Sequence, residues 1–247
     1  MEASTYALDF NPSAVEHIGE IILTEAKKSP EFASGIDYLK NSPTDIIVAE
    51  FYGENELEVK DKIENLNSKI QNSKLALSST IVMDPVHQSK VWNMREAGLG
   101  LMMNIPGDAK PLPFVEDTAV SPEKLPEYVK RFDEIVRSNG TEAGYYGHAS
   151  VGCLHVRPVI NVKNKEGIKR MHSIADEISD LVLEFGGAYT GEHGDGIVRG
   201  AWAEKMFGKK LVNYFSDVKK TFDPNSIMNP GVLIDPKDIK IPNWMEE

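Results

Sequence analysis

The apolar and polar residues follow two different periods along the chain, and this predicts an α+β fold. Apolar residues recur every three to four positions in the segments expected to be helices: 12–27, 55–72, 85–103, 122–139 and 165–185. Runs rich in β-branched and aromatic residues predict the strands: 44–52, 75–83, 113–120, 142–148 and 153–162. This order favours a mostly antiparallel sheet covered by helices, although the spacing also allows parallel pairs.

Local patterns also predict the elements near the two ends of the chain. The first predicted helix places its apolar residues on one face: Val15, Ile18 and Ile22. The segment 44–52 is rich in β-forming residues and ends at Gly53, so we expect a buried strand. Two shorter helices, predicted over 199–206 and 209–221, precede a proline-rich end.

Composition narrows the possible partners and compartment. The 247 residues carry a net charge of −11, which disfavours nucleic acid and anionic membrane as general partners. The single cysteine, Cys153, excludes an internal disulfide and fits a reducing compartment. No stretch approaches the roughly 20 apolar residues of a membrane-spanning helix, and no signal peptide is recognised. We therefore expect a cytoplasmic protein, with peripheral attachment to the inner face of a membrane as the alternative.

Three short runs mix glycine with groups that bind metals or move protons: 147–155, 191–196 and 222–231. In the first run, His148 and His155 flank Gly152, so a tight turn between two strands would point both imidazoles into one pocket. These runs are interpreted as a functional site, because packing alone does not need such a mixture. The alternative is a set of separate buried histidines with ordinary hydrogen-bond partners.

Glu192 and His193 are neighbours in the second run, and neighbours on an extended segment face opposite ways. The economical division makes His148, His155 and Glu192 ligands of one divalent ion and presents His193 to a substrate as a base. Two imidazoles and one carboxylate leave coordination positions open, which is typical of catalytic rather than structural sites.

Three basic residues are candidates for binding an anion. Arg95 lies on a predicted helix and can clamp a carboxylate, although an ordinary salt bridge is the more economical interpretation of the residue alone. Lys110 lies in a loop, where it either faces an anion or is simply solvated. Arg157 follows His155 by two positions on one strand, so the two share a face, and a buried arginine needs a partner.

The three runs, in this order, resemble the C-terminal half of FAD-linked oxidases of the vanillyl-alcohol-oxidase type. The runs Trp-x-x-Arg-Glu at 92–96 and Phe-Val-Glu-Asp-Thr-Ala-Val-Ser-Pro at 114–122 also look like this family. Its members include the glycolate oxidase flavin subunit, D-lactate dehydrogenases and D-2-hydroxyglutarate dehydrogenase. The residue sequence of the runs is most similar to that of a branch in which the flavoprotein is fused to an iron–sulfur domain. The resemblance covers roughly residues 40–235.

The resemblance implies a ferredoxin-like antiparallel sheet covered by helices, the cap domain of this family, followed by a C-terminal helical segment near the flavin. We expect an N-terminal helical segment over 1–40, a substrate domain over 41–220 and a flavin-proximal tail over 221–247. The glycine-rich loop that cradles the FAD pyrophosphate in the family is not recognised in this sequence. The chain is therefore expected to be a fragment of a longer oxidoreductase that lacks the N-terminal FAD-binding domain.

The same resemblance assigns roles to the residues of the centre. In metal-dependent members, the positions of His148, His155 and Glu192 hold a divalent ion, usually zinc. The next histidine, His193, takes the proton from the substrate hydroxyl. This division agrees with the one drawn from strand geometry.

Substrate and flavin contacts also follow from the resemblance. Arg95 would bind the substrate carboxylate, with Lys110 or Arg157 as a second contact. Asn229 and Gly231 belong to the segment that returns to the flavin. The family usually carries Gly-Asp-Gly-Asn where this chain has Ser-Val-Gly-Cys at 150–153, which alters the expected substrate contacts.

The implied activity is oxidation of a D-2-hydroxy acid (D-lactate, glycolate or D-2-hydroxyglutarate) to the 2-oxo acid, with hydride transfer to FAD. The electron acceptor would be an iron–sulfur domain, an electron carrier or a quinone, and assembly into a homo-oligomer is left open. Two alternatives from other classes are a flavin-free metal-dependent hydrolase and a non-catalytic ferredoxin-like binding module.

Overall fold

The computed structural model describes residues 1–34, 36, 39 and 42–236. Its helices are α1 (Glu2–Leu8), α2 (Glu20–Lys28), α3 (Pro30–Ala33), α4 (Glu56–Ser73), α5 (Pro85–Glu96), α6 (Gly98–Met103), α7 (Leu125–Ser138), α8 (Lys165–Phe185), α9 (Gly196–Arg199), α10 (Ala203–Phe207) and α11 (Lys209–Phe222). Its strands are β1 (Ala14–Ile18), β2 (Ile46–Glu50), β3 (Lys110–Pro111), β4 (Thr118–Ala119), β5 (Ala143–His148) and β6 (Cys153–Ile160).

The strands form one sheet in the order β2-β1-β5-β6-β3, and β4 also pairs with β6. All of these pairs are antiparallel, as the sequence favoured. From β4 to the isolated bridge between Ala119 and Ala188, the chain runs strand, helix, strand, strand, helix, bridge. This order is the ferredoxin-like arrangement. The predicted α+β fold with an antiparallel sheet is therefore confirmed.

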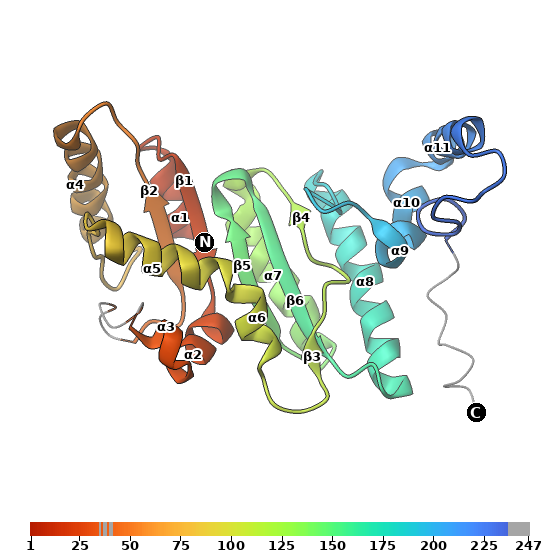
Figure 1. Cartoon of the computed structure of the whole chain (residues 1–247), viewed down its shortest axis with the longest axis horizontal. Coiled ribbons are helices and arrows are strands. Elements are labelled where there is room, and N and C mark those ends of the chain that lie inside the picture. Colours follow the sequence, from red (N-terminus) through yellow and green to blue (C-terminus); the bar gives the residue numbers. More distant parts are fainter. Residues whose placement is uncertain (35, 37–38, 40–41, 237–247) are drawn as a thin grey trace.

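Two hydrophobic cores lie on opposite faces of the sheet. One joins α7, which lies behind the sheet in Figure 1, and α8, which is seen beside it, to the inward residues of β6, among them Leu154 and Val156. The other joins α2 and α6 to Ile18 and Tyr146. Because side chains alternate along a strand, residues between the members of the first core face the second side of the sheet. His155 is one of these, and the functional site lies on that side.

The helix predicted over 12–27 is wrong at its start. Ala14–Ile18 forms strand β1, and a separate helix begins only at Glu20, after Gly19. β1 lies between β2 and β5, so Val15 to Ile18 are all buried and no alternation of polar and apolar residues marks the strand. The segment expected to be an N-terminal helical unit, 1–40, thus contributes a central strand to the sheet.

The other strand predictions are partly wrong. The segment 44–52 forms β2, but β2 is an edge strand and only half-buried. The strand predicted over 75–83 does not form, and the one over 113–120 shrinks to Thr118–Ala119. Both segments are rich in β-formers, yet strand formation also needs a neighbouring strand that offers its backbone groups.

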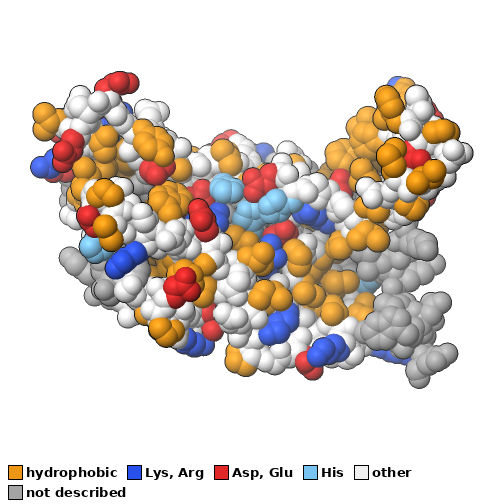
Figure 2. Space-filling view, in the orientation of Figure 1, with side chains coloured by type: hydrophobic (Ala, Val, Ile, Leu, Met, Phe, Trp, Pro, Cys, Tyr) orange, Lys and Arg blue, Asp and Glu red, His pale blue; other side chains and the backbone are white. Residues whose placement is uncertain are grey.

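Beyond the sheet, α9 to α11 extend the molecule at one end, and α4 forms the opposite end (Figure 1). Figure 2 shows a concave face between these ends, with histidine and acidic side chains gathered on its floor. The predicted C-terminal helices therefore form, and the part of the predicted tail beyond residue 236 lies outside the described residues. No helix in the described part of the chain is both long and apolar enough to cross a membrane.

Candidate metal and catalytic centre

Strands β5 and β6 carry the first two histidines of the centre. The turn between them contains Gly152, whose φ of +72° and close approach to Val120 admit no side chain, because a Cβ there would lie 1.7 Å from the Val120 carbonyl oxygen. This turn pairs Tyr146 with His155, and both imidazoles of the first run face the same side of the sheet. The predicted convergence of His148 and His155 is therefore found, with ring centroids 5.4 Å apart.

The loop that carries Glu192 and His193 folds around the carboxylate of Asp117. The Gly191 amide donates to the Asp117 carbonyl oxygen at 2.6 Å. The amides of Glu192 and His193 donate to the Asp117 carboxylate at 3.1 and 2.8 Å. The guanidinium of the buried Arg199 ties the same loop down, because it donates to the carbonyl oxygens of residues 116 and 194 at 2.7 and 2.6 Å. Asp117 itself is fully buried.

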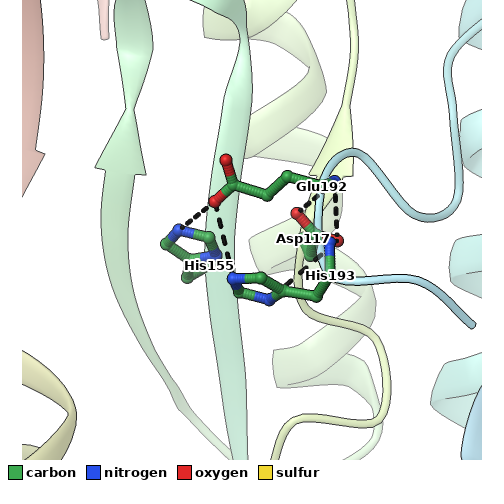
Figure 3. Close-up of side chains that lie close together, drawn as sticks. All are labelled: Asp117, His155, Glu192 and His193. Carbon is green, nitrogen blue, oxygen red and sulfur yellow. Dashed lines mark hydrogen bonds and ion pairs between the residues drawn. The ribbon is translucent and has the colours of Figure 1, made fainter. Parts of the chain in front are cut away.

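This curled backbone brings Glu192 and His193 to the same side, so the expectation that they face opposite ways is wrong. Oε1 of Glu192 lies 3.4 Å from Nε2 of His148, 3.3 Å from Nε2 of His155 and 3.5 Å from Nε2 of His193. Figure 3 shows the Glu192 carboxylate directed at the near nitrogens of His155 and His193, whose rings stack with centroids 4.9 Å apart. The alternation rule fails here because the segment is not extended.

The opposite ring nitrogens of two histidines meet buried glutamates. Nδ1 of His148 lies 2.7 Å from Glu16, and Nδ1 of His193 lies 3.0 Å from Glu116. Within the described residues, the buried Nδ1 of His155 has no hydrogen-bond partner. Three Nε2 atoms therefore lie within 3.5 Å of one carboxylate oxygen, and imidazoles with a carboxylate are a donor set that suits Zn²⁺, Mn²⁺ or Fe²⁺.

Burial and charge give these groups different protonation behaviour. Burial, together with the neighbouring imidazoles of His193 and His148, lowers the pKa of His155 to about 3. The hydrogen bond to Glu16 raises the pKa of His148, against the opposing effect of partial burial. Burial by itself would raise the pKa of Asp117, but the amides of His193 and Glu192 outweigh it and the pKa is lowered. Neutral His155 and ionised Asp117 are the forms that this site favours.

Two predicted substrate-binding arginines lie beside the centre but already have partners. Arg95 pairs with Glu16 at 2.8 Å, and Arg157 pairs with Glu116 at 2.6 Å. Both guanidinium groups lie near the ring of Tyr146, at 5.0 and 6.0 Å from its centroid. The structure therefore contains the salt bridge that the sequence suggested for Arg95.

Three other predicted residues lie outside this constellation. Lys110, expected on a loop, is the first residue of β3, and its ammonium donates to the carbonyl oxygens of Met103, at the end of α6, and of Ile105. Asn229 and Gly231 follow α11, and both have positive φ, +44° and +71°. Their roles toward substrate and flavin stay predictions.

Sequence reasoning did not single out Glu16, Glu116, Asp117 or Arg199 as members of the site. Glu116 and Asp117 lie in the run at 114–122 that carries part of the family resemblance, and this was the available signal. Glu16 had no signal, because it fell inside the helix predicted over 12–27.

A separate groove of about 1030 Å³ surrounds the edge strand β2. It is lined mainly by apolar residues of β2, α4 and the segment before α5, such as Ile46, Ile63 and Ile81. None of the four residues Asp117, His155, Glu192 and His193 lines it. The chemistry-bearing residues thus lie elsewhere, on the concave face seen in Figure 2.

The chain belongs to the family of FAD linked oxidases, C-terminal domain, which it matches over residues 7–233. It is 34% identical over 243 residues to a D-2-hydroxyglutarate dehydrogenase of Haemophilus influenzae and 29% identical over 238 residues to that of Escherichia coli. Each match takes in 93% of this chain and 23% of the relative. The chain therefore spans about a quarter of the length of these relatives.

Among solved structures, the 4-ethylphenol oxidase from Gulosibacter chungangensis, in its isoeugenol complex, has a similar fold. The TM-score is 0.53 and the sequence identity 14%, over 88% of this chain and 46% of that chain. At this identity the likeness bears on the fold alone. Together with the family match, it confirms the α+β class predicted from the sequence.

Proposed function

We propose that this chain forms the substrate side of the active site of an FAD-dependent dehydrogenase that oxidises a D-2-hydroxy acid to the 2-oxo acid. The observation that carries the proposal is the convergence of three imidazole Nε2 atoms on Glu192 Oε1, at 3.3 to 3.5 Å. Among lactate, glycolate and 2-hydroxyglutarate, the two D-2-hydroxyglutarate dehydrogenases that match over 93% of this chain favour D-2-hydroxyglutarate. Two arginines beside Tyr146 also suit a substrate with two carboxylates.

The donor set fits a divalent ion, with zinc as the first candidate. His148, His155 and Glu192 would hold it, because Oε1 of Glu192 already lies within 3.4 Å of Nε2 of both histidines. When bound, such an ion would polarise the substrate 2-hydroxyl and lower its pKa. The hydrogen bond from Nδ1 of His148 to Glu16 supports metal ligation, because it leaves the lone pair of Nε2 available to the ion.

His193 is proposed as the base that takes the proton from the substrate hydroxyl. Its Nδ1 is engaged by Glu116, so its basic nitrogen is Nε2, which faces Glu192. The His193 side chain is 43% exposed, against 35% for His148 and 5% for His155, so a substrate can reach it. FAD, which the family uses, would accept the hydride from the substrate carbon.

Substrate carboxylates would bind Arg95 and Arg157, with Lys110 as a more distant contact. Each arginine would then share its charge between a buried glutamate and the substrate. Asn229 and Gly231 would lie near the flavin. An iron–sulfur domain, an electron carrier or a quinone would receive the electrons. A flavin-free hydrolase and a non-catalytic binding module find no support among the relatives.

Metal binding by the chain tests this proposal. The chain is stripped with a chelator and titrated with Co²⁺, whose visible spectrum reports nitrogen ligands, and the loaded protein is analysed for metal content. We expect about one ion per chain in the wild type. The variants His148→Ala and Glu192→Gln should lose it, and His87→Ala should keep it, because His87 pairs with Asp84 on the surface.

His193→Asn separates the two roles that the geometry allows for this residue. If His193 is the base, the variant keeps the metal and loses oxidation of D-2-hydroxyglutarate in the FAD-loaded enzyme. Loss of the metal in this variant would instead make His193 a ligand. Equal metal binding by the wild type and by Glu192→Gln would contradict the proposed centre.

A further inference from the structure

Two buried glutamates, Glu16 and Glu116, occupy matching places behind the histidine centre. Both are 5% exposed, and they come from segments a hundred residues apart. Each uses one carboxylate oxygen for an imidazole Nδ1 and the other for an arginine. The centre therefore contains an arginine, a glutamate and a histidine in contact twice. Arg95 donates a hydrogen bond to Glu16, whereas Arg157 and Glu116 form an ion pair in which Oε2 of Glu116 makes no hydrogen bond to the described residues.

The first arrangement is built by the sheet. Glu16 on β1 lies directly opposite His148 on β5 in the antiparallel register. Its Oε1 lies 2.7 Å from Nδ1 of His148, and its Oε2 accepts from Nε and Nη2 of Arg95 at 2.9 and 2.8 Å. Arg95 reaches it from α5, so the pair also ties a helix to the sheet.

The second arrangement is built across the loop. Oε1 of Glu116 lies 3.0 Å from Nδ1 of His193, and Oε2 lies 2.6 Å from Nη2 of Arg157 on β6. Oε2 also faces Nδ1 of His155 at 3.8 Å, which is too long for a hydrogen bond. His193 therefore has a firm carboxylate partner, whereas His155 has none among the described residues.

The arginines decide what these glutamates can do. A buried carboxylate is costly unless it is paired, and each arginine supplies that pairing. An ionised carboxylate only accepts hydrogen bonds, so the imidazole nitrogen that meets it must carry the proton. His148 and His193 are thereby held with the proton on Nδ1 and the lone pair on Nε2, where it faces Glu192.

We propose that Glu16 and Glu116 are positioning residues that set the tautomers of His148 and His193, and that Arg95 and Arg157 enforce this setting. The use of these tautomers rests on the proposed function, because the Nε2 lone pair would bind a metal or accept a proton there. Its physical content holds for the metal-free chain.

The substitution Glu16→Gln gives a sharp test. Glutamine offers one carbonyl oxygen and one amide NH₂. Arg95 can only donate, so it will take the carbonyl oxygen and turn the NH₂ toward Nδ1 of His148. The imidazole must then accept at Nδ1 and carry its proton on Nε2. We therefore expect the tautomer of His148 to invert in this variant, and that of His193 to invert in Glu116→Gln.

The tautomers are read from long-range ¹H–¹⁵N spectra of the ¹⁵N-histidine-labelled, metal-free chain, at an alkaline pH where imidazoles are neutral. The expected wild-type result is a proton on Nδ1 of both His148 and His193. A wild-type proton on Nε2 of His148 would overturn the proposal without any variant. Glu25→Gln is the matched control, because Glu25 is a buried glutamate that pairs with Lys28 away from the centre.

A second substitution separates this role from a merely structural one. In Glu16→Gln with Arg95→Met, nothing competes for the glutamine carbonyl oxygen, so it can accept from His148 and restore the Nδ1 tautomer. Co²⁺ affinity should fall about 10- to 100-fold in Glu16→Gln and recover in the double variant. An unchanged tautomer in Glu16→Gln, or no recovery in the double variant, would overturn the inference.

The two proposals fail in different ways. Wild-type chain that binds no Co²⁺ but shows both expected tautomers, with inversion in the glutamine variants, would contradict the metal site and support the positioning role. Normal Co²⁺ binding with unchanged tautomers in the glutamine variants would do the reverse.

Discussion

The two halves of the histidine centre are held by different physical means. His148 and His155 lie on neighbouring strands, and backbone pairing fixes their separation residue by residue. Glu192 and His193 lie on a loop with no such ladder, and the carboxylate of Asp117 gathers their amides instead. The strand half spreads its support over many hydrogen bonds, whereas the loop half depends on two buried charged groups, Asp117 and Arg199.

Substitution of Asp117 should break the loop half most severely. Asp117→Ala leaves the amides of Glu192 and His193 without their acceptor and the buried Arg199 without its nearby carboxylate. We expect unfolding free energy to fall by about 3–5 kcal/mol in urea titrations, and Co²⁺ binding to be lost.

Asp195→Ala is the control for this prediction, because Asp195 lies on the same loop and its carboxylate accepts only from Thr190 among the described residues, at 2.6 Å. It should cost about 1 kcal/mol. If both variants lost the same amount, the special role of Asp117 in the loop would be refuted.

The histidines of the strand half should make the unfolding free energy depend on pH. His155 has a pKa of about 3 when folded and 6.5 when unfolded, so between these values the unfolded chain binds a proton that the folded chain refuses. The stabilisation is complete above pH 6.5 and is lost as the pH falls. His148 acts with the opposite sign, because its folded pKa is raised and its contribution is lost as the pH rises.

This predicts that the stability of the wild type falls more steeply with acid than that of His155→Gln. The difference should be about 1 kcal/mol between roughly pH 6 and pH 5, measured by urea titration at each pH. Parallel profiles for the two proteins would show that His155 is not held neutral by its surroundings.

Cys153 offers the mildest perturbation of the contact between the two halves. Its thiol, on β6, lies 3.2 Å from Oδ1 of Asp117, and burial raises the pKa of the thiol above its ordinary value. Cys153→Ser keeps a donor at this place, so unfolding free energy should change by less than about 1 kcal/mol and metal affinity should hold.

The same thiol reports on loop closure. It should react slowly with a thiol reagent in the native wild type, because it is buried and protonated. It should react much faster in Asp117→Ala, where the loop above it is released. Equal labelling rates in the two proteins would show that Asp117 does not hold the loop closed.

Local patterns predicted the parts of the fold that local forces decide. The helix expected over 165–185 forms with those limits, because its apolar stripe, the cap at Asn164 and the stop at Gly186 are all nearby in sequence. β1 was missed because a central strand is buried on both faces and shows no period of two. The strand expected over 75–83 failed for want of a neighbouring strand, which no local pattern reveals.

The same division applies to the site. His148 and His155 were brought together correctly, because the turn at Gly152 is local. The convergence of Glu192 and His193 was not foreseen, since the group that bends their backbone is 75 residues away in sequence. The partner of His148 is 132 residues away. Family resemblance supplied the ligand roles, but the supporting carboxylates required the folded chain.

The position of Glu16 on β1 limits which part of the chain could carry this centre to another scaffold. A graft of residues 114–199 onto another scaffold would carry the three histidines, Glu192, Asp117 and Arg199, yet it would leave behind β1 with Glu16 and α5 with Arg95. His148 would then have no carboxylate to orient it. The smallest unit that could be transplanted is therefore the sheet from β1 to β6 together with its surrounding helices. The glycine-rich runs mark the centre in the sequence, but they do not contain all of its parts.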